Sequence, residues 1–201
     1  VLAPARLLGG ELEIRLGHFD LARRVLEKVG KDAAPEVQAK ALRLRAHSFQ
    51  AQEQWDKAAD LWRQVLVGDQ QSGEGLYNLG LCAQHQDQAA DAARYWQQCV
   101  AVGGDEGQAA ALALAEMRLK GPNPETAVEM FAAAVEKLKP GDDWANPLAD
   151  KASAVKLFEE AGKTYLESRQ YEAAVRLAGP FAKVAPAGAA DVLRAEASVE
   201  W

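Results

Sequence analysis

The sequence is poor in several features that define common classes of protein. It has only two cysteines, Cys82 and Cys99, in 201 residues, too few for a disulfide framework and no guide to the redox compartment. Arg, Lys, Asp or Glu interrupts every apolar stretch before it is long enough to cross a bilayer, which argues against membrane insertion by this chain. Lys and Arg number 23 against 29 Asp and Glu. This acidic balance argues against nucleic acid and anionic membranes as partners.

Catalytic and metal-binding motifs are also missing. Cys82 and His85 lie three residues apart on a predicted helix, as two metal ligands would. Two ligands do not make a site, however, and we interpret Cys82 and Cys99 as buried structural thiols because both lie where packing residues are expected. Gly103-Gly104 lacks the Lys and Ser/Thr that follow the glycines of a phosphate-binding loop. No motif places a Ser–His–Asp set, so we expect neither an enzyme nor a bound metal or cofactor.

The most regular feature of the sequence is a pair of small residues twelve positions apart, which recurs five times. The second members of consecutive pairs are 36, 34, 35 and 47 residues apart. A tight crossing of two antiparallel helices requires small residues, because a larger side chain pushes the axes apart. The pairs are Gly10 and Ala22, Ala46 and Ala58, Gly80 and Ala92, Ala115 and Ala127, and Gly162 and Ala174.

Large side chains recur beside these pairs and make the period convincing. We interpret Trp55, Trp62 and Trp96 as packing residues of such columns. Trp144 lies outside the columns and is a candidate for a functional aromatic residue. Four residues after the second small residue come Leu26, Trp62, Trp96, Phe131 and Ala178. Three residues before it come Phe19, Trp55, Ala89, Pro124 and Tyr171.

The repeated unit resembles the tetratricopeptide repeat. The third unit matches that signature best, and the fifth also carries much of it. The matching residues are Leu76, Leu79, Gly80, Ala92, Trp96 and Cys99 in the third unit, and Phe158, Gly162, Tyr165, Tyr171, Ala174 and Pro186 in the fifth. The resemblance implies an all-α fold, a right-handed α-solenoid of antiparallel helix pairs with about five repeats and a terminal helix.

The pattern also predicts how the chain is organised. Repeats one to four are expected over residues 1–139, an irregular insertion over 140–150, and repeat five with a capping or half-repeat helix over 151–201. Turn residues such as Gly103-Gly104 mark the divisions, and we expect a kink or break at Gly179-Pro180. The predicted helices are 3–16, 20–30, 36–52, 56–67, 73–86, 89–102, 106–120, 124–138, 149–168, 171–184 and 188–201.

In proteins with this repeat, the first helix of each unit lines a concave groove that binds a short peptide or a partner helix. The resemblance therefore predicts a face that binds another protein. Carried over position by position, the face would present Leu7, Glu11 and Ile14; Arg43, His47 and Gln50; Tyr77, Leu81 and Gln84; Leu112, Glu116 and Leu119; and Lys156, Glu159 and Lys163.

Some family members grip a C-terminal carboxylate with Lys, Arg and Asn side chains. Arg43 and Asn78 occupy two of those positions, but His47 replaces an Asn, and Ala109 and Ala113 replace the required cations. A carboxylate would lose its hydration there with little return. We therefore favour a general groove over this clamp.

Three functions remain open from the sequence. The first is a protein-interaction scaffold within a larger assembly or secretion protein. The second is a regulatory or sensory appendage of an enzyme whose catalytic domain lies elsewhere. The third is a homo-oligomerisation module that uses the edge helices or the convex face.

A start without methionine and an end inside a predicted helix indicate a piece of a longer chain, and the Ala-rich, Lys-poor repeats are typical of a high-GC bacterium. The compartment stays open between cytoplasm and periplasm.

Overall fold

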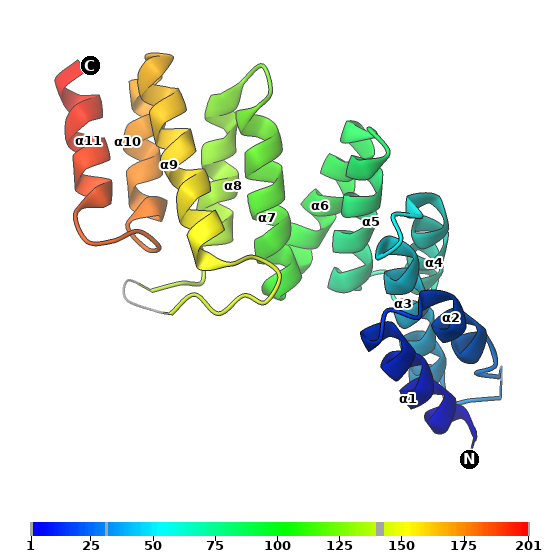
Figure 1. The fold of residues 1–201 in the computed structure, drawn as a ribbon. Coiled ribbons are helices and arrows are strands. Elements are labelled where there is room, and N and C mark those ends of the chain that lie inside the picture. The colour runs from blue at the N-terminus through cyan, green and yellow to red at the C-terminus, as the bar shows by residue number, and fades with distance from the viewer. Residues whose placement is uncertain (1, 31, 140–142, 201) are drawn as a thin grey trace. The chain divides into compact units, whose positions relative to one another are not determined.

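A computed structural model of the protein describes residues 2–30, 32–139 and 143–200. Within these residues the chain forms eleven α-helices, one 3₁₀-helix and no strand (Figure 1). The predicted all-α solenoid of helix pairs is confirmed. The elements are α1 (Leu2–Arg15), α2 (Phe19–Glu27), α3 (Pro35–Gln50), α4 (Trp55–Gly68), α5 (Gly73–His85), α6 (Ala89–Val102), α7 (Gly104–Leu119), η1 (Pro124–Thr126), α8 (Ala127–Ala134), α9 (Lys151–Glu167), α10 (Tyr171–Phe181) and α11 (Ala189–Glu200).

The chain divides into two compact units, Val1–Tyr95 and Trp96–Trp201. In the first unit α1 packs against α2 and α3 against α4, and α3 also contacts both helices of the preceding pair. In the second unit α7 packs against α8 and α9 against α10, while α11 packs on both α10 and α9. Each pair therefore buries an apolar face against its neighbour, which is how repeats of this kind gain stability.

The small-residue columns predicted from the sequence lie in the core. All ten residues of the five pairs are buried. The residue that lies four positions after the second member of each pair is buried as well. At Gly10 the fit is tightest, because a Cβ atom there would lie 2.4 Å from Cδ2 of Leu26. The second large column is only half-buried at Trp55 and Tyr171 and exposed at Ala89. The columns thus mark helix contacts, as the period indicated.

Four of the tight turns between paired helices share one backbone geometry. The residue seven positions after the first small residue has a positive φ: 77° at Gly17, 57° at Glu53, 57° at Asp87 and 56° at Arg169. The next amide then donates to the carbonyl five positions before it, at 2.8, 2.9, 2.8 and 2.7 Å. This is the Schellman ending of a helix, which favours glycine at the left-handed position.

Only one of these four turns has the favoured glycine, so the others offer a gain in stability. A left-handed backbone costs a residue with a Cβ atom about 1–2 kcal/mol. We expect Glu53→Gly and Arg169→Gly each to raise the free energy of unfolding by about 1 kcal/mol, and Gly17→Ala to lower it by about as much. Urea unfolding of the three variants measures these changes. A loss of stability in both glycine variants would contradict this description of the turns.

The ends of three helices differ from their predicted positions, each for a local reason. Helix α8 ends at Ala134, earlier than predicted, and Nζ of Lys183 donates to the carbonyl of Val135 just beyond it, at 2.9 Å. The start of α9 is set by Asp150, whose side chain accepts a hydrogen bond of 2.9 Å from the amide of Ser153. The predicted break at Gly179-Pro180 is shifted, since α10 continues through Pro180 and ends one residue later.

The predicted insertion lies partly outside the described residues, because residues 140–142 are not among them. Trp201, in the last predicted helix, also lies outside them. Residues 143–150 contain no helix. Asn146, which is 8% exposed, fixes this segment to α7 by donating to the carbonyl of Asp105 and to Oε1 of Gln108, both at 2.8 Å. Trp144 packs against the core of the second unit, and its Nε1 donates to the carbonyl of Ala149 at 2.5 Å. The segment is therefore held against the repeats.

Candidate functional site

In the first unit, two predicted groove residues of α3, Arg43 and His47, meet α5 through a residue that sequence reasoning missed. That residue is Glu74, in the first turn of α5. Nε2 of His47 lies 2.8 Å from one Glu74 oxygen. Nε of Arg43 lies 3.3 Å from the other, an ion-pair distance without a well-directed hydrogen bond. The charge of Glu74 therefore offsets that of Arg43, so this surface offers little to a free carboxylate.

Gln50 extends this polar network into the core. Its Nε2 donates to Oδ1 of Asn78 at 3.0 Å, and its Oε1 accepts from Nε1 of Trp62 at 3.1 Å. Nδ2 of Asn78 in turn donates to the carbonyl of Glu74 at 2.8 Å. Gln50 and Asn78 are thus positioned by hydrogen bonds between the first helices of two successive repeats, and Asn78 is only 7% exposed.

The remaining predicted residues of the first unit lie on α1 and α5. Leu7, Glu11 and Ile14 of α1 are half-buried. Oε2 of Glu11 lies 3.2 Å from Nζ of Lys40, and this hydrogen bond lowers the pKa of the Glu11 carboxyl. On α5, Tyr77 and Leu81 are half-buried and Gln84 is exposed. We refer below to the side of α1, α3 and α5 that carries these residues as the first-helix face of the first unit.

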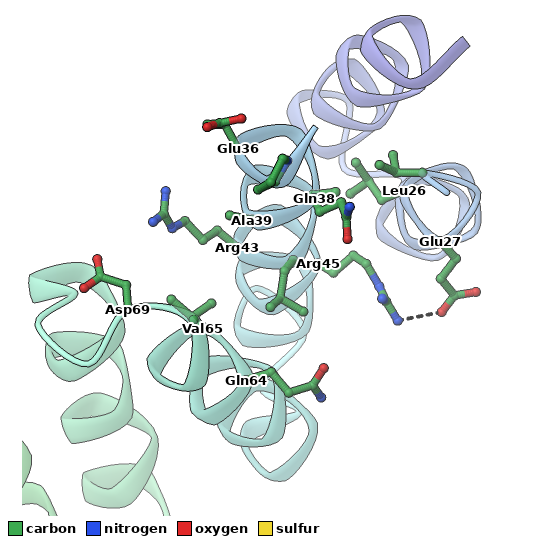
Figure 2. Close-up of a pocket in the computed structure, with 15 residues that line it drawn as sticks. Leu26, Glu27, Glu36, Gln38, Ala39, Arg43, Arg45, Gln64, Val65 and Asp69 are labelled. Carbon is green, nitrogen blue, oxygen red and sulfur yellow. Dashed lines mark hydrogen bonds and ion pairs between the residues drawn. The ribbon is translucent and has the colours of Figure 1, made fainter. Parts of the chain in front are cut away.

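The first unit also has a cleft that was not predicted. This cleft has a volume of about 620 Å³ and opens between α2 and α4, with α3 beneath it (Figure 2). Arg45 reaches across to α2, where Nη2 donates to Oε1 of Glu27 at 2.9 Å. The lining of the cleft combines residues of both charges with buried apolar residues. The labelled lining residues are Leu26, Glu27, Glu36, Gln38, Ala39, Arg43, Arg45, Gln64, Val65 and Asp69.

In the second unit the predicted residues of α7 serve mainly in packing and ion pairs. Leu112 is only 7% exposed and belongs to the core cluster, so its side chain is not offered to a ligand. Oε1 of Glu116 lies 2.5 Å from Nζ of Lys120, one turn further along the helix. Leu119 is half-buried against the same core.

Two of the three predicted residues of α9 lie at a groove. This groove has a volume of about 500 Å³ and is formed by α9, the end of α10, and α11. Glu159 and Lys163 lie on its rim, whereas Lys156 is one turn away and lies 3.9 Å from Glu160. We call it the α9/α11 groove. Its lining residues are Phe158, Glu159, Gly162, Lys163, Leu166, Glu167, Phe181, Ala189, Val192, Leu193 and Glu196.

The two residues that the sequence marked as possible metal ligands do different things. Cys82 is fully buried, and its Sγ lies 3.9 Å from Nε2 of Gln50. His85 is exposed, and its ring stacks on Trp55 with centroids 3.8 Å apart. Among the residues that the structure describes, no three His, Cys, Asp or Glu side chains are grouped as metal ligands would be.

Burial makes the Cys82 thiol unreactive, because it raises the pKa from 9.0 to about 12. In a Cys99→Ala background at pH 8, we expect a thiol reagent to label native Cys82 on the order of a thousandfold more slowly than in urea. The raised pKa also means that the free energy of unfolding is unaffected at neutral pH and falls as the pH rises from 9 towards 12. Rapid labelling of the native protein would contradict the placement of this thiol.

These features define an all-α helical-repeat protein whose first helices carry a polar face in one unit and a groove in the other. Comparison with known proteins assigns part of the chain to a family. Residues 43–98 match the tetratricopeptide repeat family, so this segment is made of tetratricopeptide repeats and confirms the resemblance seen in the sequence. A sequence comparison with curated proteins gives no significant match.

Solved structures extend the likeness of fold to nearly the whole chain. MamA is similar with a TM-score of 0.65 and 17% identity over 99% of this chain and 91% of MamA. YrrB, described as a tetratricopeptide repeat protein with an unusual peptide-binding site, has a TM-score of 0.60 and 19% identity over 96% of this chain and 90% of YrrB. BtubC from P. vanneervenii has a TM-score of 0.61 and 16% identity, covering 95% of this chain and 76% of BtubC. The chain thus has the fold of these helical-repeat proteins over nearly its whole length.

Among the described helices, none combines the length and the apolar character that crossing a bilayer requires.

Proposed function

We propose that this chain is a scaffold that binds an extended peptide or a helix of a partner protein on the side formed by its first helices. The observation that carries the proposal is the α9/α11 groove, which combines an apolar floor with a charged rim. Two of its rim residues, Glu159 and Lys163, are positions that the family resemblance predicts for the ligand side. Concave sites with apolar linings and a few polar groups are the usual form of a binding site.

The first-helix face of the first unit supports the same function in a different way. There the polar side chains are already oriented by contacts between successive repeats, as in the Glu74 and Gln50 network. Pre-oriented polar groups lose less conformational entropy when a ligand binds. This face is therefore suited to hydrogen-bonding a peptide.

The proposal is tested by selecting peptides from a displayed random library against the chain and measuring their affinity by fluorescence anisotropy. Val192 lies in the groove and is 57% exposed, whereas Val199 lies on the same helix outside the groove and is 84% exposed. We expect Val192→Ser to weaken binding about three- to tenfold, and Val199→Ser to leave it unchanged. Failure to enrich any peptide, or equal effects of the two changes, would overturn the proposal.

A second function, self-association, is favoured by the outer side of α1. Leu8 and Leu12 of α1 and Leu16 just beyond its end are 70%, 55% and 57% exposed, and they follow one another at a spacing of four residues. A leucine stripe at this spacing is typical of a helix that packs against another helix. We propose that two copies of the chain associate through this stripe.

Light scattering across a range of concentrations tests self-association. The mass of the unchanged chain is expected to rise with concentration, and Leu8→Glu with Leu12→Glu is expected to keep the chain monomeric. A monomer at high concentration, before any substitution, would exclude this second function.

A further inference from the structure

The rim of the α9/α11 groove is acidic. Among its lining residues Glu159, Glu167 and Glu196 carry carboxylates, and Lys163 is the only cation. Nζ of Lys163 lies 3.7 Å from Oε1 of Glu167, so that pair is internally balanced. Within the described part of the chain, Glu159 and Glu196 have no ion-pair partner of their own. Both are exposed, one on α9 and one on α11. The groove therefore has an unbalanced negative charge on each of its two walls.

The floor of the groove is apolar and closely packed. Phe158, Gly162 and Leu166 follow one another at a spacing of four residues and form a single stripe on α9. Opposite them lies Leu193, whose Cδ1 would be 3.0 Å from a Cβ atom at Gly162. The missing side chain at Gly162 thus lets α11 approach α9 at this point. The volume of about 500 Å³ is within the range of about 300–1,000 Å³ that is usual for binding pockets.

Charge and shape together identify the chemistry of the occupant. An apolar side chain gains by leaving water for the accessible part of the floor at Leu166 and Val192. The carboxylate on each wall of the groove attracts a cation, so a Lys or Arg of the peptide can lie before or after the apolar side chain. An acidic peptide would instead be repelled by both walls.

We propose that the α9/α11 groove binds a peptide that places a large apolar side chain on the floor and a Lys or Arg beside it, paired with Glu159 or Glu196. This inference rests on the proposed function, since it names the class of peptide that the groove takes. Exposed ion pairs contribute little free energy, so the carboxylates act mainly on selectivity. Each pair that is lost is expected to weaken binding about two- to fivefold.

The test uses the same displayed random peptide library against two double variants with equal net charge. The first, Glu159→Lys with Glu196→Lys, changes the groove. The second, Glu129→Lys with Glu172→Lys, changes exposed carboxylates of α8 and α10, which do not line the groove. Circular dichroism establishes that both variants are folded before selection.

We expect the unchanged chain and the second variant to enrich peptides with Lys or Arg within two positions of an apolar residue. The first variant is expected to lose this preference and to bind those peptides about three- to tenfold more weakly. Enrichment with the same basic preference in all three proteins would overturn the inference and leave the proposed function standing. Enrichment of no peptide by the unchanged chain would overturn both.

Discussion

Replacement of Trp62 by alanine is expected to lower the free energy of unfolding by about 3–5 kcal/mol. Trp62 is 0% exposed and lies in the core cluster of the first unit. Its ring meets that of His47 edge to face, with centroids 4.9 Å apart, and its Nε1 donates to Gln50. The substitution leaves a cavity and removes the hydrogen bond that orients Gln50. Urea unfolding followed by circular dichroism measures the loss.

Trp55 provides the matched control for this prediction. It is half-buried, and its main aromatic contact is the stack on His85. Its replacement by alanine removes a stacked pair worth about 0.5–1.5 kcal/mol beyond the area it buries, so we expect a clearly smaller loss. A Trp55→Ala variant that is less stable than Trp62→Ala would show that the wrong tryptophan has been assigned to the core.

The second prediction concerns two adjacent glycines of α1, for which the same substitution has opposite signs. At Gly10 an added Cβ atom would lie 2.4 Å from both Cγ and Cδ2 of Leu26, which is itself 1% exposed. Because a buried side chain has no free space to move into, Gly10→Ala forces the two helices apart. Overpacking of this kind costs about 1–3 kcal/mol, of which the higher helix propensity of alanine recovers up to about 1 kcal/mol.

At Gly9 the nearest atom to an added Cβ is Cγ1 of Val25, at 3.6 Å, an ordinary van der Waals distance. Gly9→Ala therefore keeps the gain in helix propensity and is expected to stabilise the protein by about 0.5–1 kcal/mol. Thermal and urea unfolding of the two variants give the comparison. Equal effects of the two substitutions would contradict the close crossing of α1 and α2 at Gly10.

The helix pairs were predictable because a physical constraint recurs in every repeat. A crossing of two helices tolerates only small residues, so Gly10 and its counterparts remain visible in the sequence as a regular column. The columns of large residues at Trp62 and Trp96 are visible for a related reason, since they fill the space beside each crossing. The period of these columns is a property of neighbouring helices, which local sequence determines well.

The candidate sites were less predictable, because they depend on contacts between repeats. Carrying over family positions placed Leu112 on the groove, but α7 buries it in the core. The same procedure missed Glu74, whose role depends on where α3 lies beside α5. Nothing in the sequence indicated the cleft above α3, since its lining comes from three helices and no column marks it. At Glu53 the backbone is left-handed, but glutamate is not a residue type that indicates a left-handed turn.

The central claim, that a partner binds on the side of the first helices, is tested most directly by photo-cross-linking. A benzophenone amino acid is placed either at Lys163 of α9 or at Arg176 of α10, both of which are exposed. Each protein is irradiated with a peptide selected from the library, and the adducts are quantified by mass spectrometry. The proposed function predicts adducts from position 163 and little from position 176. Adducts formed mainly from position 176 would contradict it.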